Sequence, residues 1–585
     1  MAAKKPQKSV VVELQYEDGP IRASAMGASS ESLPSYYVVP TELVEAASIL
    51  AEATPLPQDG SPKFLAESET VSSKRGHADT YAMPPVLRKG YGLHEYSPEP
   101  GQAYRFGDNK SQVVQPGQTK ENGSHDEKRS ASHWWMANIK QRGSSPFAPE
   151  GYKDYGAKGD GKPDDTAAIN RAISDGGRCG RNCSGSTIHP ATVYFPPGVY
   201  MVSSSIIQYY NTEIIGDPID MPRIMAAPSF TGLGVITTNV YESDDTKWYP
   251  SKLSFLRSVR NLYIDIRCTP KVAQVCGIHW QGIFMEDGNG GFMSNILFLG
   301  GKYGAYMGNQ QFTARDLWFS DILDAAIQLR WAWGLTLQGI NFKNVKTDIK
   351  IIESGEKTAD GQGVGSLVVT DIQGEAMDAF ITSTLSFESS TSIMIQNALM
   401  NDVDAFVTEA ESGKVLLAGD GDAEEIVPIK SWGFGRVTDT SGNTTFVSGG
   451  EIAAPNRVSM LTRPGLSSSI RDTEYYFTRQ RPRFVNLGGC DLLDVKAWGA
   501  KGDGKIDDTV ALNRAFEAAA DMSAIVYIPY GVYVIKDTVT IPVGSRVIGQ
   551  AWPQLMGTGA KFEDISKPRP VIRVGVPGNQ GVAEI

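Results

Sequence analysis

Six polar and aromatic side chains recur in the middle of the chain at a spacing that suits one shared site. They are two acidic residues in MEDGNGG, two glutamines in GNQQF and two tryptophans in RWAW, namely Glu286, Asp287, Gln310, Gln311, Trp331 and Trp333. Carboxylates accept hydrogen bonds from hydroxyl groups, and an amide can orient a water molecule without a shifted pKa. An aromatic face can pack against the apolar face of a sugar ring. These residue types could therefore bind a ligand that has both hydroxyl groups and an apolar face.

Each pair also has a structural interpretation, and the residues alone leave both interpretations open. Gln310 and Gln311 would suit an amide ladder, in which stacked side chains hydrogen-bond for stability. Trp331 and Trp333 would suit the core. Glu286 and Asp287 would suit a polar turn beside Gly288.

A long internal repeat defines the elements that must position these side chains. Gly156–Ala172 reads GAKGDGKPDDTAAINRA and Gly499–Ala515 reads GAKGDGKIDDTVALNRA, identical at fourteen of seventeen positions. The similarity continues from Ala191–Val202 (ATVYFPPGVYMV) to Ala524–Ile535 (AIVYIPYGVYVI), with ten extra residues in the first copy. The chain therefore contains two copies of one domain type.

Paired aspartates occur in both copies, as Asp164 with Asp165 and as Asp507 with Asp508. Such pairs can serve calcium binding or acid–base chemistry. Here they stand beside a predicted helix start, where Asp165 or Thr166 can cap the helix. We therefore expect them to form turns and caps rather than a catalytic site.

After the first opening block, short β runs recur at intervals of 20 to 26 residues. Ile296, Leu317 and Ile340 begin similar strands, Ala305, Ala326 and Asp348 mark a second phase, and Asp378-Ala379-Phe380 recurs as Asp404-Ala405-Phe406. Two strands per repeat of this length indicate a parallel β-helix. We predict an all-β fold, a right-handed parallel β-helix with the start of a second tandem β-helix that looks truncated.

Composition and charge agree with this fold class and exclude others. The 585 residues include 61 Gly and 33 Pro, too many for a helix bundle, and the net charge of −11 argues against a nucleic-acid-binding protein. The chain holds no run of about 18 apolar residues, as a membrane-spanning helix needs. We expect a monomer that contacts neither nucleic acid nor membrane.

The opening block GAKGDGKxDDT with the following PPGVY resembles the pectate-lyase-like superfamily of β-helix proteins. Three further stretches narrow the resemblance: His133–Phe147 (HWWMANIKQRGSSPF), Gly282–Phe312, which ends in GNQQF, and Tyr476–Phe484 (YFTRQRPRF). With two tandem β-helices, residues 131–585 look like fungal exo-β-1,3-glucanases (glucan 1,3-β-glucosidases) of glycoside hydrolase family 55.

This resemblance implies a function and a site. Members of the family release glucose from the non-reducing end of β-1,3-glucan with inversion, in a pocket between two β-helices. Gln310 and Gln311 match the family's water-positioning region, whereas Glu286, Asp287, Trp331 and Trp333 would bind the substrate. An inverting enzyme needs space for a water between its acid and its base. No cofactor or metal is implied.

The expected catalytic acid, a glutamate far along the second β-helix, has no match in this chain. Glu517 lies on the predicted opening helix of the second copy, and Glu563 and Glu584 stand in unsuitable contexts. We therefore expect the general acid beyond Ile585 and an incomplete site. The predicted divisions are an extension with one helix (Thr41–Ala53), a first β-helix, a linker and the beginning of a second β-helix, at 1–130, 131–410, 411–490 and 491–585.

Two competing functions stay open. The first is pectin chemistry, by a polygalacturonase or a lyase, but the sequence contains no Gly-His-Gly, and Asp316, Asp321 and Asp324 are scattered rather than clustered for calcium. The second is a non-catalytic glycan-binding homologue, which the missing acid favours. Binding without turnover would identify it.

The five cysteines and the N-terminus bear on compartment. Their spacing suggests two local pairs, Cys179 with Cys183 and Cys268 with Cys276, and leaves Cys490 unpaired. Buried free thiols are the alternative. The family resemblance implies an extracellular protein, although the N-terminus lacks the apolar stretch of a secretory signal.

Overall fold

The computed structural model describes residues 104–106, 155–176, 178–181, 183, 190–243, 246–249, 254–269, 281–352, 363–383, 391–421, 426–438, 441–452, 462–464, 474–476, 482–484 and 491–585. The predicted helix Thr41–Ala53 and the stretch HWWMANIKQRGSSPF lie outside these residues. Among the described residues, no helix is long and apolar enough to cross a membrane.

The first copy of the repeat opens with a short strand and a helix, β2 (Asp160–Asp164) and α3 (Thr166–Ser174). Parallel strands follow: β3 (Ala191–Phe195), β4 (Val199–Ile207), β5 (Thr212–Gly216), β6 (Arg223–Thr237) and β9 (Ser254–Asp265). β1 (Tyr104–Phe106) pairs antiparallel with β3, and β7 (Tyr241–Ser243) pairs with β8 (Thr246–Lys247).

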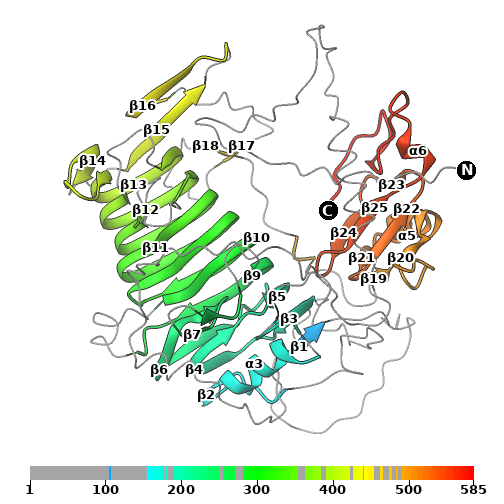
Figure 1. Cartoon of the computed structure of the whole chain (residues 1–585), viewed down its shortest axis with the longest axis horizontal. Coiled ribbons are helices and arrows are strands. Elements are labelled where there is room, and N and C mark those ends of the chain that lie inside the picture. Colours follow the sequence, from blue (N-terminus) through cyan, green and yellow to red (C-terminus); the bar gives the residue numbers. More distant parts are fainter. Residues whose placement is uncertain are drawn as a thin grey trace, which may run out of the picture. The chain divides into compact units, whose positions relative to one another are not determined.

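The stack continues through longer elements that pair in parallel in chain order (Figure 1). These are β10 (Gln281–Leu299), β11 (Tyr303–Ile351), β12 (Ser366–Ser383) and β13 (Ser392–Glu409). Antiparallel strands then follow on β13: β14 (Val415–Gly421), β15 (Val427–Thr438) and β16 (Thr444–Glu451). The parallel β-helix that the sequence predicts is confirmed.

The periodic residues meet in register, as their spacing predicts. Ile296 pairs with Leu317, Ile340 pairs with Ile372, and Ala379 pairs with Ala405. Inside the stack, the rings of Phe298, Phe319 and Phe342 lie over one another, with centroids 4.6 and 5.5 Å apart. The core is therefore a set of aligned apolar columns, one residue from each turn.

A polar ladder does exist, but at a turn rather than at the glutamines. Asn261, Asn295, Asp371 and Asn397 all adopt the left-handed conformation, with φ between 53° and 60°. The Asn295 amide donates to Asn261 Oδ1 at 3.0 Å, and the Asn397 amide donates to Asp371 Oδ1 at 2.6 Å. Asn and Asp tolerate this conformation, so the ladder turns the chain between neighbouring strands.

The second copy repeats the opening pattern in β20 (Asp503–Asp507) and α5 (Thr509–Met522). Its other elements are β19 (Leu492–Asp494), β21 (Ile525–Ile528), β22 (Val532–Ile535), β23 (Val539–Ile541), β24 (Arg546–Gly549), β25 (Gln554–Gly557), α6 (Ala560–Glu563) and β26 (Ile572–Val574). They pair in parallel around a core of their own. Between the copies, β17 (Thr462–Pro464) pairs with β18 (Glu474–Tyr476).

The cysteines follow one of the two predicted pairings. Cys179 and Cys183 form a disulfide, with Cα atoms 5.3 Å apart. Cys268 is instead an exposed free cysteine whose Sγ lies 3.6 Å from the Met225 sulfur, so its predicted pairing with Cys276 is wrong. Cys276 and Cys490 lie outside the described residues.

Candidate functional site

Strands β10 and β11 bring part of the predicted site together. Glu286 of β10 pairs in register with Gly308 of β11, and Arg330 of β11 reaches back to Glu286. Arg330 Nη1 lies 3.2 Å from Glu286 Oε1. A side chain on Gly308 would collide with its neighbours, because its Cβ would lie 2.9 Å from Trp331 Nε1 and 3.3 Å from Glu286 Cγ. Gly308 therefore lets the indole and the carboxylate approach each other.

The Glu286 carboxylate is almost fully buried, and the Arg330 guanidinium partly so. The Glu286 backbone is also held in place. Glu286 N donates to Thr238 Oγ1, and that hydroxyl donates to Glu286 O, each at 3.1 Å. A buried carboxylate paired with a guanidinium is held in one orientation. Glu286 is therefore not the polar turn residue of the alternative interpretation.

Asn309, the residue after Gly308, has an unusual environment. It is 1% exposed, and neither its Oδ1 nor its Nδ2 has a hydrogen-bond partner among the described residues. A buried amide without partners costs free energy unless a ligand or water satisfies it. The neighbourhood of Glu286 and Trp331 thus contains an amide that could take a hydroxyl group or a water.

The two predicted glutamines differ in exposure. Gln310 is 4% exposed, whereas Gln311 lies on the surface. Alternation of faces along a strand does not explain this difference, because Asn309 and Gln310 are adjacent and both buried, whereas Gln311 is exposed.

The two tryptophans also differ in exposure. Trp331 is 7% exposed and lies beside Gly308 and Glu286, whereas Trp333 is 41% exposed. Asp287 lies at an irregularity in the pairing of β10 with β11, between Glu286 and Gly288, and its side chain lies outside the described part. The structure therefore brings Glu286 and Trp331 together beside Gly308, buries Gln310 two residues further along β11, and leaves Gln311 and Trp333 exposed.

Arg330 contacts Glu286, and Asn309 follows Gly308, although sequence reasoning singled out neither residue. Arg330 stands 44 residues after Glu286, which is two steps of the repeat, and Asn309 lies inside GNQQF. A search for a basic residue about 44 residues, or two repeats, after each acidic residue would have found this ion pair.

The aspartates considered for calcium have structural roles. Asp316 and Asp321 occupy left-handed turn positions, and Asp321 Oδ1 accepts from the Asn344 amide at 2.7 Å. Asp324 pairs with Lys350 at 3.1 Å. Within the described ranges, no group of three His, Cys, Asp or Glu residues is placed to hold a metal ion.

The paired aspartates of the repeat form turns, as predicted, but the predicted cap is wrong for Asp165, because its side chain makes no cap hydrogen bond to α3. Asp164 Oδ1 accepts from Thr166 N at 3.0 Å, and Asp165 Oδ1 accepts from Lys158 N at 2.7 Å. Burial raises the pKa of Asp164, but hydrogen bonds from Ser203 and Thr166 outweigh it, so its pKa lies below the usual value. These carboxylates serve the fold.

Comparison with known proteins identifies relatives of both copies. Residues 152–283, 281–350 and 492–567 match the family model described as rhamnogalacturonase A/epimerase, pectate lyase-like. A protein of Cochliobolus carbonum named glucan 1,3-beta-glucosidase is 32% identical over 77% of this chain, and a probable glucan endo-1,3-beta-glucosidase of Arthroderma benhamiae is 34% identical over 78%.

A third relative has a different name. The non-secreted LysM effector LysM15 of Penicillium expansum is 42% identical over 94% of this chain. The chain spans 40% of the length of this effector, and 59% and 64% of the Cochliobolus and Arthroderma proteins. It therefore matches a part of each relative.

Proposed function

Because the chain carries pectate lyase-like domains and is homologous to glucan 1,3-β-glucosidases, we propose that it is a glycoside hydrolase acting on β-1,3-glucan. The observation that carries the proposal is a cluster of buried residues along β10 and β11: the ion pair of Glu286 and Arg330 beside Trp331, and the buried amides of Asn309 and Gln310 that follow Gly308. A fixed carboxylate, an amide without partners and an indole edge suit the hydroxyl groups and ring of a sugar.

Roles within this cluster follow from burial. Gln310, rather than the exposed Gln311, positions the attacking water, as the resemblance to glycoside hydrolase family 55 implies. Glu286, held by Arg330, accepts hydrogen bonds from sugar hydroxyls, and Trp331 contacts the ring. Exo action with inversion is the finer proposal, and the general acid stays unassigned within this chain.

The test is glucose release from a soluble β-1,3-glucan, with the anomer identified by proton NMR immediately after the bond is cleaved. Initial α-glucose supports exo-acting hydrolysis with inversion. Gln310→Ala should lower kcat at least about tenfold if the amide orients the water, whereas Gln311→Ala should leave it unchanged. Equal rates for the two variants would overturn the role of Gln310.

A non-catalytic function is the second candidate, because relatives named LysM effectors align with nearly the whole chain. Saturable binding of the glucan without glucose release would support it. The extracellular location stays a proposal as well, since those relatives are named non-secreted, and detection of the protein in culture medium tests it.

A further inference from the structure

A groove lies over the first β-helix, at other parts of β10 and β11 than those of the candidate site and at β12 and β13. Its cavity of about 470 Å³ is lined by residues of β10, β11, β12 and β13. This volume is within the range of binding pockets for small ligands. The candidate site uses the first part of each turn, whereas the groove lies over the part that follows the polar ladder.

Two parallel rows of outward-facing side chains form its floor. Leu297 pairs with Trp318, and Asn341 pairs with Gln373, which pairs with Leu399. In the second row Leu299 pairs with Ser320, and Lys343 pairs with Glu375, which pairs with Asn401. Neighbouring strands stand about 4.8 Å apart, so polar groups recur across the groove at a short, regular interval.

Trp318 is the aromatic side chain exposed in this groove. It is 55% exposed, whereas its neighbours Leu317 and Phe319 point into the core. Burying an indole is favourable, so an exposed one beside polar side chains marks a surface that binds a ligand with apolar and polar faces. Asn401 Oδ1 supplies a second sign, since it is buried and has no hydrogen-bond partner among the described residues.

The charges of the groove indicate a neutral ligand. The charged residues that line it are Lys343 and Glu375, and the ammonium lies 3.1 Å from both carboxylate oxygens. The cation is already neutralised, so neither a phosphate nor a uronate would meet a free positive charge. The groove combines apolar side chains, among them Leu297, Leu399 and the Trp318 indole, with the amides and hydroxyl of Asn341, Gln373, Asn401 and Ser320. Such a mixture suits a chain of neutral sugars, whose rings have apolar faces and whose hydroxyl groups repeat.

We propose that this groove binds a neutral glucan chain, with Trp318 stacking on a sugar ring and Asn341 and Asn401 hydrogen-bonding its hydroxyl groups. The groove is separate from the cluster around Glu286 and Trp331, and its proposal stands whether or not the chain hydrolyses glucan. The groove would be a second polysaccharide-binding site, in addition to the candidate active site.

The experiment uses the full chain labelled with 5-fluorotryptophan and observed by fluorine NMR. The signal lost in Trp318→Ala identifies Trp318, and the signals of Trp331 and Trp498 are assigned in the same way. Laminarihexaose should shift the Trp318 signal saturably, whereas hexagalacturonate should not. Trp498 is exposed but lies in the second copy, so its signal should not shift.

Two variants measure the contribution of single side chains by calorimetric titration with laminarihexaose. Trp318→Ala should raise Kd about tenfold and Asn401→Ala about fivefold, whereas Trp498→Ala should leave Kd unchanged. Asn401→Ala removes little apolar area and should fold normally. It therefore tests the groove independently if Trp318→Ala has a folding defect.

The outcomes separate this proposal from the proposed hydrolysis. A laminarihexaose-induced shift of Trp331 without a shift of Trp318 would overturn the groove and leave the candidate active site intact. An equal response of Trp318 to hexagalacturonate would overturn the neutral-ligand argument. A saturable Trp318 shift with no glucose release would support the groove and count against hydrolysis.

Discussion

The two copies of the repeat build the same opening structure from nearly the same residues. Asp165 accepts from Lys158 N and Gly159 N at 2.7 and 3.1 Å, and Asp508 accepts from Lys501 N and Gly502 N at 2.6 and 3.0 Å. Each loop thus closes on a buried carboxylate. The correspondence of these contacts shows that the repeated sequence block specifies how the loop before the helix closes.

Other equivalent residues repeat their contacts as well. Tyr200 donates to Pro196 O at 2.9 Å, and Tyr533 donates to Pro529 O at 2.7 Å. The hydroxyl of Thr166 accepts from Ser203 N, and that of Thr509 accepts from Lys536 N, each at 2.9 Å. Conserved chemistry in both copies therefore lies where the fold begins, not where the candidate site lies.

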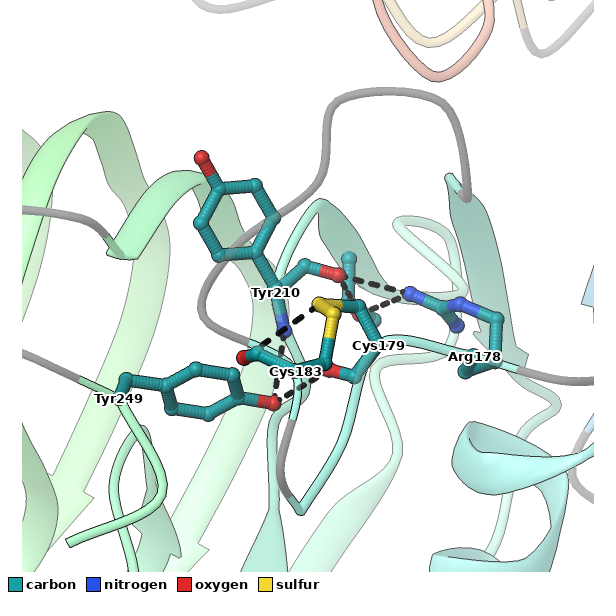
Figure 2. Close-up of a disulfide and its surroundings, with 6 residues drawn as sticks. Arg178, Cys179, Cys183, Tyr210 and Tyr249 are labelled. Carbon is teal, nitrogen blue, oxygen red and sulfur yellow. Dashed lines mark hydrogen bonds between the residues drawn. A yellow bond between two sulfur atoms is a disulfide. The ribbon is translucent and has the colours of Figure 1, made fainter. Parts of the chain in front are cut away.

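The copies diverge immediately after the helix. α5 continues to Met522 and ends at Ser523 in a left-handed conformation, whereas α3 ends at Ser174 and leads into the segment with the disulfide. Figure 2 shows how the residues around this disulfide hold one another. Arg178 donates to Tyr210 O at 2.9 Å, and Tyr249 donates to Cys179 O at 2.6 Å.

This difference teaches where an inserted segment is tolerated. The insert leaves the opening loop unchanged because Arg178 donates to Ile173 O of α3 and to Tyr210 O and Asn211 O, none of which belongs to that loop. Tyr210 is buried there, and burial raises its pKa to about 12, so it stays a neutral phenol at physiological pH. The first copy has gained a compact, cross-linked corner that the second copy lacks.

The largest expected effect tests the shared opening structure. Asp165→Ala and Asp508→Ala should each destabilise the copy that carries it by about 2–4 kcal/mol, because two backbone N–H groups lose a charged acceptor. Hydrogen exchange followed by mass spectrometry would report the two copies separately. Asp160→Ala and Asp503→Ala, at the first residues of β2 and β20, are the controls. Their carboxylates accept only exposed backbone N–H groups, so the expected loss is smaller, about 1 kcal/mol or less.

Unequal effects of Asp165→Ala and Asp508→Ala would break the comparison. They would mean that equal contacts do not carry equal stability in the two copies.

A second test removes the feature that distinguishes the copies. Replacing Cys179 and Cys183 by Ser opens a short disulfide loop, for which loop-closure entropy predicts a loss of about 2 kcal/mol. Hydrogen exchange should accelerate in residues 175–183 and 208–212 of the first copy. Faster exchange in α5 would contradict the independence of the two opening structures.

The third test concerns Asp348, in the long stack of the first copy. Asp348 is fully buried, neither carboxylate oxygen has a hydrogen-bond partner among the described residues, and burial raises its pKa well above the usual value. The folded state therefore binds this proton more tightly than the unfolded state. Stability should be highest below the unfolded pKa and fall, by about 1.4 kcal/mol per pH unit, as pH rises towards the folded pKa.

Asp348→Asn should remove this slope, because an amide does not titrate. The measurement is Tm between pH 4 and pH 8 for the wild type, Asp348→Asn and the control Asp324→Asn, whose carboxylate is paired with Lys350. Parallel pH profiles for the wild type and Asp348→Asn would contradict the argument.

Much of the fold could be predicted from the sequence because its signals are periodic. Ile296, Leu317 and Ile340 occupy one core position on successive turns, and a column of apolar residues leaves a repeat that can be counted. The repeated block GAKGDGK was equally informative, since the same residues make the same contacts twice.

The candidate site was harder to predict because it depends on register within a strand. GNQQF offers two glutamines, and no residue type in this stretch signals that Gln310 is buried and Gln311 exposed. The irregularity between Glu286 and Gly288 shifts the register locally, which no residue type signals. Arg330 was missed because an ion pair across two turns leaves no local pattern.

Equivalent strands of the two copies also contact each other. Tyr194 and Tyr527 occupy matching positions of the repeat, as do Ile215 and Ile548, and all four lie in one apolar cluster. Glu213 stands beside this cluster, where its Oε2 accepts from Thr192 Oγ1 at 3.0 Å and from Ala551 N of the second copy at 3.2 Å. One carboxylate thus joins the two copies.

The smallest expected effect tests this contact. Glu213→Gln keeps the size of the side chain but removes its charge, and it should weaken the contact by about 1 kcal/mol, the difference between a charged and a neutral acceptor. Hydrogen exchange should accelerate at 525–528 and 546–551, while α3 and α5 stay unchanged. Because Glu213 accepts from only one backbone N–H of the second copy, a uniform loss of protection across that copy would show that it depends on the first copy to fold. The similarity of the two opening structures would then not extend to independent stability.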